Sequence, residues 1–414
     1  MIDAGTQIRR IKRLRNSPTL RSIVVYGASG AGFAGANLIL AYELPRQEYA
    51  LFTLVLALVN LAAPASPLGL DALILRRRLT IGDQVLRRLL LAASVVTVGF
   101  ILVGHFVYHL GPWLLLIIAV SSIGGALMAV AGARLQSEQR FALALSLTQS
   151  PNVILMVAAL AAYAAGWKVA WPALVISAIG YATAAIVGWA IVRRDPAYGS
   201  DTTAPFSWGE ALALAGLDAS GLLLLQLDRL VIPWLLPLNA LALFGVLSAI
   251  AGSVFRVLQM GVGYALIPRL RAATGVAQRR RLVRYDVLLV MGLMILGALA
   301  VAVAVPLVKH FLLHGKYDLK PPLVLAVVVS GIAKVLNAFG KALVAGLALP
   351  DEVNTVNLLG WLSVAVAIAA AWVGSQWGLA GVIYGVGLGW LMRALAAFRI
   401  CAPHLRLPEP VPAQ

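Results

Sequence analysis

Long apolar stretches of about 20 residues follow one another along the chain, separated by short polar segments. A helix needs roughly 20 apolar residues to cross a bilayer, so each stretch predicts a membrane-spanning helix. The twelve predicted spans are Ile23–Tyr42, Ala50–Leu75, Leu89–Leu110, Trp113–Ala133, Leu143–Ala165, Trp171–Val192, Glu210–Leu236, Leu241–Ile267, Val287–Val308, Pro322–Leu349, Val356–Val373 and Leu379–Ile400. The pattern indicates an all-α integral membrane protein.

Four polar residues recur at helical spacing in the tenth span, and this spacing places them on one face of the helix. They are Ser330, Lys334, Asn337 and Lys341. A lysine at the bilayer centre costs roughly 2.5–3.5 kcal/mol, so such residues usually face a bundle interior or a watery cavity. Lys341 is near enough to the helix end to reach the interface, but Lys334 is not. The stripe predicts a cation-lined cavity; the alternative is that both lysines reach the interface or pair with buried acids.

Further charged residues lie in the seventh and eighth spans. Asp218 and Arg229 are eleven positions apart and share a face, with Gln226 close by, whereas Asp228 points elsewhere. The eighth span carries Arg256 near mid-membrane and Gln259. Two interpretations stay open: the cations bind substrate in one cavity, or two Asp–Arg pairs hold these two helices together. No acid is evident for the lysines of the tenth span. In the first half, the second span carries Asn60 and, near its cytoplasmic end, Asp71.

Composition agrees with a membrane environment, since 61% of the 414 residues are hydrophobic and only 12% are charged. A net charge of +17 would suggest nucleic acid as the partner of a soluble protein, but here the basic residues sit between the spans. With the N-terminus in the cytoplasm, inside segments hold 23 Lys and Arg and outside loops five. The positive-inside rule therefore predicts both termini in the cytoplasm. The single cysteine, Cys401, excludes an internal disulfide framework.

An internal repeat divides the chain into halves. LPRQEYALFTLVLAL (residues 44–58) matches LPLNALALFGVLSAI (residues 236–250) at an offset of 192 positions. We predict two six-helix bundles, residues 23–192 and 210–400, related by a pseudo-two-fold axis along the membrane normal. A cytoplasmic linker, residues 193–209, joins them. A basic amphipathic segment, residues 1–22, is predicted to lie on anionic lipid, and residues 401–414 form a cytoplasmic tail.

A dinucleotide-type fingerprint also occurs in the first span, in GASGAGFAG. A real nucleotide site would require an acidic residue about 20 positions later, at the end of a second strand. No acid occurs there before Asp71, so we interpret the small residues as helix-packing positions. The sequence predicts no catalytic residue, no cofactor and no metal site.

The segment ANLILAYELPRQEYALFTLVLALVNLAAPASPLGLDALILRRRL resembles the opening of polysaccharide flippases of the MOP exporter superfamily. LLQLDRLVIPWLLPLNALALFGVLSAIAG is similar to the seventh-helix pattern of that family, and GLAGVIYGVGLGWLMRAL resembles its last helix. The resemblance implies twelve helices in two bundles and export of polyprenyl-diphosphate-linked glycans. The family's cavity cations match Arg229, Arg256, Lys334 and Lys341 in type and helix only.

These observations lead to one functional hypothesis with two alternatives. The hypothesis is a flippase of the bacterial inner membrane that moves a lipid-linked oligosaccharide to the outer leaflet by alternating access, alongside a glycan polymerase of the same pathway. The first alternative is a cation-coupled drug or small-molecule antiporter, for which Asp218, Asp228 or Asp71 would be the coupling acid. The second alternative is a membrane glycan polymerase or ligase, which should carry a large polar outer loop.

Overall fold

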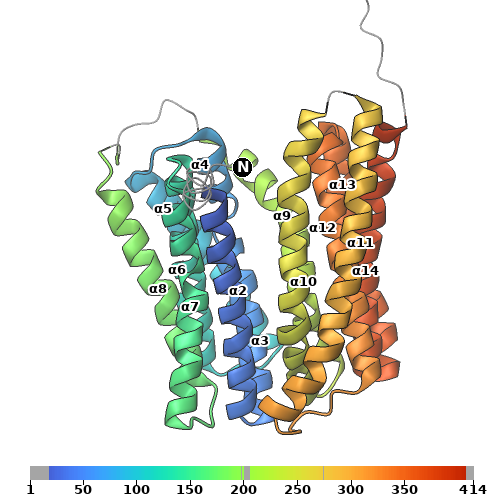
Figure 1. The fold of residues 1–414 in the computed structure, drawn as a ribbon. Coiled ribbons are helices and arrows are strands. Elements are labelled where there is room, and N and C mark those ends of the chain that lie inside the picture. The colour runs from blue at the N-terminus through green and yellow to red at the C-terminus, as the bar shows by residue number, and fades with distance from the viewer. Residues whose placement is uncertain (1–17, 197, 200–205, 274, 407–414) are drawn as a thin grey trace, which may run out of the picture. The chain divides into compact units, whose positions relative to one another are not determined.

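The computed structural model describes residues 18–196, 198–199, 206–273 and 275–406. Almost all of these residues are helical and none of them is in a strand, which confirms the predicted all-α class (Figure 1). GASGAGFAG lies inside a helix, so the strand and turn of a dinucleotide site are not formed there. The predicted amphipathic segment and the end of the predicted tail lie mostly outside the described residues.

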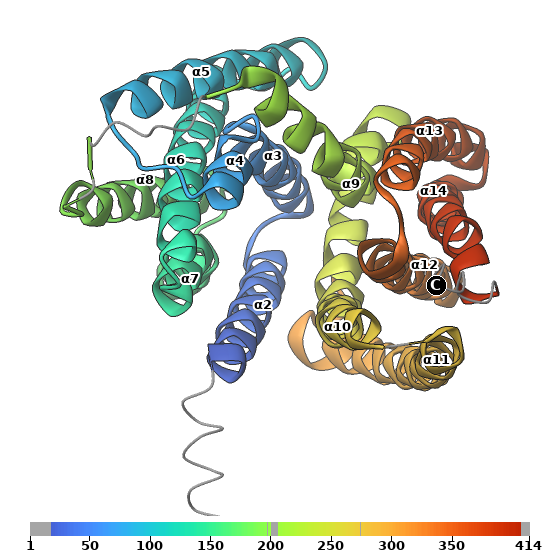
Figure 2. The same ribbon diagram turned by 90° about the horizontal axis from the view of Figure 1, so that it is seen from above.

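The described residues divide into two compact units, one ending at Ala219 and the other beginning at Ser220. The helices of the first unit are α2 (Pro18–Glu43), α3 (Arg46–Ala65), α4 (Leu70–Arg77), α5 (Asp83–Phe106), α6 (Pro112–Ser137), α7 (Phe141–Ala165) and α8 (Trp171–Arg193), followed by the beginning of α9 (Trp208–Leu235). Within this unit α6 packs against α3 and α8, and α7 packs against α2 and α8 (Figure 2).

The second unit contains the remainder of α9 and five further long helices. They are α10 (Leu238–Ala272), α11 (Val276–Leu307), α12 (Pro321–Leu347), α13 (Pro350–Gly374) and α14 (Gly378–Cys401). A π-helical turn, Val308–Leu312, extends α11, and short 3-10 turns follow α13 and α14. α12 lies against both α10 and α14, and α13 lies against α14.

Nine helical segments of the described chain are long and apolar enough to cross a membrane, or ten if the two segments of α9 form one span. One of the nine, Asp351–Cys401, contains both α13 and α14. Large apolar side chains are freely exposed on α5 and α11, such as Leu91 (63%) and Leu288 (64%). Exposed apolar surface of this extent is stable in lipid and not in water. The membrane fold is therefore confirmed, while the count of twelve spans stays a prediction.

The helix boundaries follow the repeat. α3 begins at Arg46 and α10 begins at Leu238, which are 192 positions apart. Their N-cap residues adopt the same extended conformation, with φ −53° and ψ 152° at Pro45 and φ −55° and ψ 144° at Pro237. α6 begins at Pro112 and α12 begins at Pro321, which are 209 positions apart. The starts of α7 and α13 differ by the same offset. The second half therefore carries an insertion between α11 and α12.

The predicted second span, Ala50–Leu75, is not one continuous helix. It breaks between α3 and α4, where Gly69 has a left-handed φ of 80°. A Cβ on Gly69 would lie 2.0 Å from the carbonyl oxygen of Ala211, so a side chain cannot fit there. The close approach places the start of α9 against α4, where Glu210 forms ion pairs with Arg76 and Arg77. These contacts explain why the division between the units falls inside α9 and not in the predicted linker, residues 193–209.

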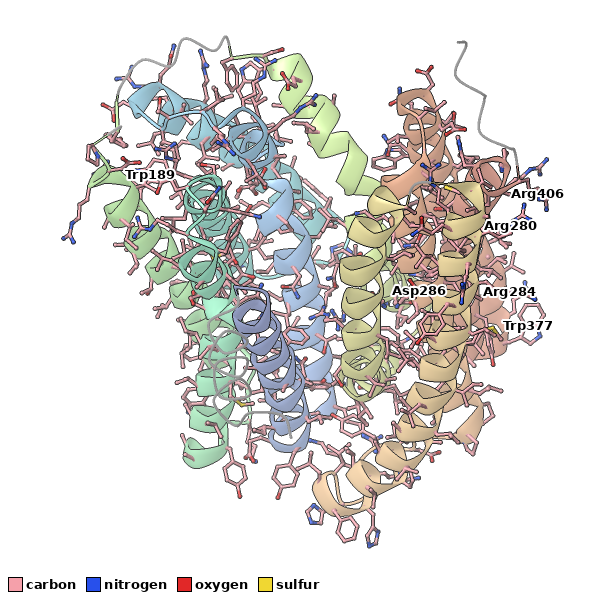
Figure 3. The ribbon with its side chains drawn as sticks, turned by 45° about the horizontal axis from the view of Figure 1, so that its top comes forward. Trp189, Arg280, Arg284, Asp286, Trp377 and Arg406 are labelled. Carbon is pink, nitrogen blue, oxygen red and sulfur yellow. The ribbon has the colours of Figure 1, made fainter. Side chains whose placement is uncertain are left out.

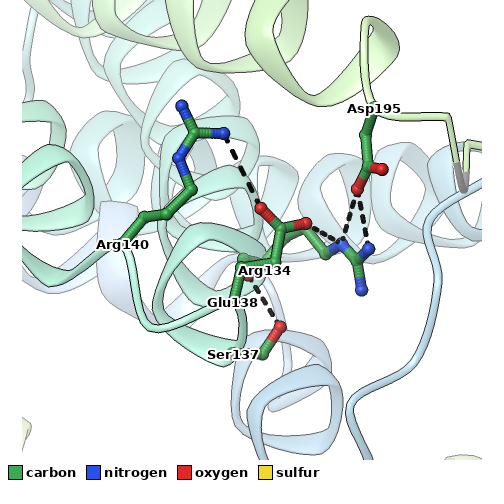
Figure 4. A network of polar contacts seen from close by, with 5 residues as sticks. All are labelled: Arg134, Ser137, Glu138, Arg140 and Asp195. Atoms are coloured by element: carbon green, nitrogen blue, oxygen red, sulfur yellow. Dashed lines mark hydrogen bonds and ion pairs between the residues drawn. The ribbon is translucent and has the colours of Figure 1, made fainter.

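Polar contacts join the ends of helices in both units. In the first, Arg134 at the end of α6 contacts Asp195 beyond α8 at 2.7 Å and Glu138 at 2.7 Å (Figure 4). Burial, together with the neighbouring Asp195, raises the pKa of the Glu138 carboxyl. In the second unit the guanidinium of Arg280, near the start of α11, donates to the carbonyl of Leu405 (Figure 3).

Candidate functional site

An ion pair between two membrane-spanning helices is the centre of the candidate site. Nζ of Lys334 on α12 donates to Oδ2 of Asp228 on α9 at 3.0 Å. The side chain of Asp228 is 2% exposed and that of Lys334 is 18% exposed. The prediction that Lys334 lacks an acid is therefore wrong. Helical spacing shows which residues share a face of one helix, and it carries no information on a partner 106 positions away.

Buried polar atoms surround this ion pair. The ring of Trp390 on α14 lies 6.0 Å from Nζ of Lys334, within the range of a cation–π contact. Three nearby groups are buried and have no hydrogen-bond partner among the described residues: Oδ1 of Asp228, Oγ of Ser330 and Nε1 of Trp390. Buried polar groups in native proteins are almost always hydrogen-bonded, so such atoms call for an explanation, and a ligand supplies one. Ser330 is the first residue of the predicted stripe.

A second polar contact joins α9 to α10. The guanidinium of Arg229 donates to Oε1 of Gln226 at 2.9 Å and to Oγ of Ser248 at 3.1 Å. The expected closeness of Gln226 to Arg229 is confirmed. The idea that Asp–Arg pairs hold α9 and α10 together is wrong for Asp228, because its carboxylate binds Lys334 of α12 instead. The side chain of Asp218 lies outside the described residues.

The remaining predicted residues differ in burial and in position. Arg256 on α10 and Lys341 on α12 are exposed, whereas Gln259 and Asn337 are half-buried. Asn60 on α3 is half-buried in the first unit. Asp71, in the first turn of α4, also belongs to the first unit. The second unit therefore contains the predicted cations, whereas the first contains three predicted residues, Asn60, Asp71 and Asp218.

Sequence reasoning missed Arg393 on α14. A Cβ on Gly221 of α9 would lie 3.1 Å from its Nη1, and a Cβ on Gly360 of α13 would lie 3.5 Å from its Cζ. The guanidinium of Arg393 thus lies against α9 and α13 at glycine positions, which have no side chain to occupy the space. Two features of the sequence point to Arg393. It is a charged residue inside a predicted span, and it lies three positions after Trp390, on the same face of the helix.

The repeat shows that this chemistry belongs to one half of the chain. At the offset of 192, Asp228 corresponds to Ala36, and at the offset of 209, Lys334 corresponds to Gly125. A Cβ on Gly125 would lie 2.3 Å from Cβ of Ala63, so α6 packs closely on α3 there. The first half thus uses small residues for helix packing at positions where the second half carries a buried ion pair.

The arrangement suits an anionic ligand better than a metal ion. No group of three or more His, Cys, Asp and Glu side chains that could hold a metal occurs in the described part of the chain. Arginine and lysine are the side chains that bind phosphate, the former through a planar fork and the latter as a compact point charge. The helices of the second unit carry several cationic side chains, among them Arg229, Arg256, Lys334, Lys341 and Arg393.

Comparison with known proteins gives a fold and no sequence family. No family model matches the chain, and no curated protein sequence matches it. Among solved structures, a multidrug resistance MATE family transporter of the MOP superfamily has a TM-score of 0.65 with 14% identity, over 91% of this chain and 94% of that one. The lipid II flippase MurJ has a TM-score of 0.63 with 10% identity, over 91% and 86%.

A third solved structure, a MOP superfamily transporter from Pyrococcus furiosus, has a TM-score of 0.55 with 14% identity and covers 95% of this chain and 97% of that one. The binding pocket of that transporter has reverse polarity. The similarity to all three extends over nearly the whole chain at low identity, so it reports on architecture. This chain has the fold shared by the MATE and MurJ transporters of the MOP superfamily.

Proposed function

We propose that this protein is a membrane flippase that moves a polyprenyl-diphosphate-linked oligosaccharide from the cytoplasmic to the outer leaflet. A fold shared with MATE transporters and with the lipid II flippase MurJ supports a membrane exporter. The finer assignment, a glycan carried on a diphosphate lipid, rests on the charges of the second unit. It also agrees with the resemblance of residues 36–79 to polysaccharide flippases.

The observation that carries the proposal is the excess of cations in the spans of the second unit. The described helices of the second unit carry Arg229, Arg256, Lys334, Lys341 and Arg393 among their cations, together with two buried carboxylates, Asp228 and Asp286. Each cation at membrane depth costs a few kcal/mol, and such residues mark ligand pathways. A diphosphate supplies two or more negative charges and several acceptor oxygens, which match guanidinium and ammonium groups.

The ion pair gives the lysine a defined role in this scheme. The carboxylate of Asp228 compensates the charge of Lys334. A phosphate oxygen that reaches the partly exposed Nζ replaces this carboxylate as acceptor. Binding of the diphosphate and loosening of the contact between α9 and α12 are thereby coupled.

Transport in reconstituted vesicles tests the proposal. The probe is undecaprenyl-diphosphate N-acetylglucosamine with a fluorophore on the sugar, and its transfer between leaflets is followed by chemical quenching from outside. Wild-type protein should accelerate transfer, and Arg256→Gln and Lys341→Gln should slow it about tenfold. Leu336→Ala, on α12 but outside the polar stripe, is the matched control and should retain the wild-type rate. Equal rates in vesicles with and without protein would contradict the proposal.

A cation-coupled antiporter is the second candidate, and the buried carboxylate of Asp228 favours it. A buried carboxylate at membrane depth is typical of ion pathways. An antiporter of cationic drugs should bind ethidium, and Asp228→Asn should abolish this binding. The diphosphate flippase should bind undecaprenyl diphosphate instead, and added ethidium should not compete with it.

A further inference from the structure

A group of uncharged polar side chains lies in the middle of the membrane helices of the first unit. Oγ of Ser29 on α2 donates to Oε1 of Gln149 on α7 at 2.7 Å. Nδ2 of Asn152 on α7 donates to Oγ of Ser29 at 2.8 Å and to Oε1 of Gln149 at 3.1 Å. Ser29 is the twelfth residue of α2 and Asn152 is the twelfth of α7, so both lie near mid-span. None of these residues was singled out in the sequence.

The circuit of hydrogen bonds determines which amide atoms stay available. Oε1 of Gln149 accepts twice, and both N–H groups of Asn152 are used. Among the described residues, the amide NH₂ of Gln149 therefore has no acceptor and the carbonyl Oδ1 of Asn152 has no donor. The cluster thus presents two N–H donors and one carbonyl acceptor next to each other. A hydroxyl group both accepts and donates, so a sugar with neighbouring hydroxyls is complementary to this pair.

The amide groups of the cluster are partly accessible. Ser29 is 4% exposed, while Gln149 and Asn152 are half-buried. An unsatisfied amide facing hydrocarbon costs several kcal/mol, so half-exposed amides in mid-span are stable only beside water or a polar ligand. The neighbouring positions of α2 are small: Ala28 and Ala31 are exposed, and a Cβ on Gly30 would meet nothing within 4 Å. The positions of α2 next to Ser29 are therefore small and accessible.

The local structure of α7 supports the same placement. Pro151 lies inside the helix and cannot donate to the carbonyl of Leu147, but Oγ of Ser150 donates to that carbonyl at 2.8 Å. The helix therefore keeps its backbone satisfied around the proline, and Gln149 and Asn152 are free to serve another purpose. Their positions three apart place both amides on the same face, against α2.

We propose that Ser29, Gln149 and Asn152 form a carbohydrate subsite that binds the hydroxyl groups of the glycan head of the transported lipid. This inference rests on the proposed function and adds to it. The diphosphate is assigned to cationic side chains, and the sugar is assigned to this neutral amide site. Neutral donors and acceptors suit a sugar because its hydroxyls carry no charge. The cluster would contribute nothing to a diphosphate without sugar.

Binding measurements on purified full-length protein in detergent separate the two assignments. The probes are undecaprenyl diphosphate and a panel of undecaprenyl-diphosphate saccharides carrying N-acetylglucosamine, galactose or rhamnose. Wild-type protein should bind at least one saccharide probe about tenfold more tightly than undecaprenyl diphosphate, since a few hydrogen bonds supply such a ratio. Gln149→Leu and Asn152→Leu should each remove most of this preference and leave the affinity for undecaprenyl diphosphate unchanged.

Thr148→Val is the matched control, because its hydroxyl bonds only to the carbonyl of Leu145 in its own helix. It should retain the full sugar preference. Thermal unfolding of each variant reports on folding, and Gln149→Met replaces Gln149→Leu if the latter unfolds early. A wild-type protein with no preference for any saccharide, or a preference retained in both Leu variants, would overturn the subsite. Failure of undecaprenyl diphosphate itself to bind would instead contradict the proposed function.

Discussion

Lys334 on α12 and Asp228 on α9 form an ion pair of 3.0 Å in the middle of the second unit. This contact changes the meaning of the lysine. A lysine without an acid would have served a ligand alone, and its removal would have relieved a burial cost. A lysine that neutralises a carboxylate exposed by only 2% also contributes to the packing of α9 and α12.

The first prediction concerns the stability of this pair. Lys334→Ala should lower the unfolding free energy by about 3–5 kcal/mol, because it leaves the carboxylate of Asp228 buried and uncompensated. Asp228→Asn should be destabilising for the same reason. The double variant Lys334→Met with Asp228→Leu removes both charges and should recover most of the stability while transport stays lost. Thermal unfolding in detergent and the vesicle assay measure the two properties. A Lys334→Ala protein as stable as the wild type would show that the pair does not form in the membrane.

The helices and the repeat could be predicted because each depends on local pattern. A run of apolar residues identifies a span whatever its neighbours are, and Pro45 and Pro237 mark the starts of equivalent helices by their fixed φ. The partner of Lys334 could not be predicted, since nothing in the sequence states which helices are adjacent. The left-handed turn at Gly69 was not predicted, because its close contact with Ala211 comes from a helix distant in sequence.

The neutral cluster around Ser29 shows a second limit. Charged residues in a span attract notice because their cost is large, whereas Gln149 and Asn152 are common in helices and give no such signal. Their significance arises only when α2 and α7 are adjacent and the hydrogen bonds can be followed from atom to atom.

The second prediction tests the packing of α12 on α10. A Cβ on Gly331 would lie 2.3 Å from the ring of Phe255, which is 1% exposed. Gly331→Ala should therefore cost about 1–3 kcal/mol, the usual range for overpacking a core. Gly292→Ala on α11, where a Cβ meets nothing within 4 Å, is the control and should be close to neutral. Adding Phe255→Leu to Gly331→Ala should recover part of the loss, because the smaller side chain leaves room for the methyl group.

The third prediction concerns orientation. A reporter that is active only outside the cytoplasm should be silent when it is fused after Gln414 and active when it is inserted near Lys316. The basis is the distribution of lysine and arginine, 23 in the predicted inside segments and five in the outside loops. An active reporter at the C-terminus would contradict the twelve-span topology and the parallel orientation of the two halves.

The last prediction compares two arginines of one network at the end of α6 (Figure 4). Arg134 is 12% exposed and donates to Asp195 at 2.7 Å while contacting Glu138 at 2.7 Å. Arg140 is 51% exposed and lies 3.7 Å from Glu138. Charge-assisted hydrogen bonds of a buried guanidinium contribute about 1.5–3 kcal/mol each, whereas an exposed ion pair contributes about 0–1 kcal/mol.

Arg134→Gln should therefore lower the thermal unfolding temperature clearly, because it leaves two carboxylates close together without a cation between them. Arg140→Gln should change the unfolding temperature little, and high salt should remove that small difference. The comparison keeps residue type and substitution constant, so only burial and geometry differ. Equal effects of the two substitutions would mean that Arg134 does not connect the end of α6 to Asp195 in solution. A larger effect of Arg140→Gln would reverse the assignment of which arginine holds the network together.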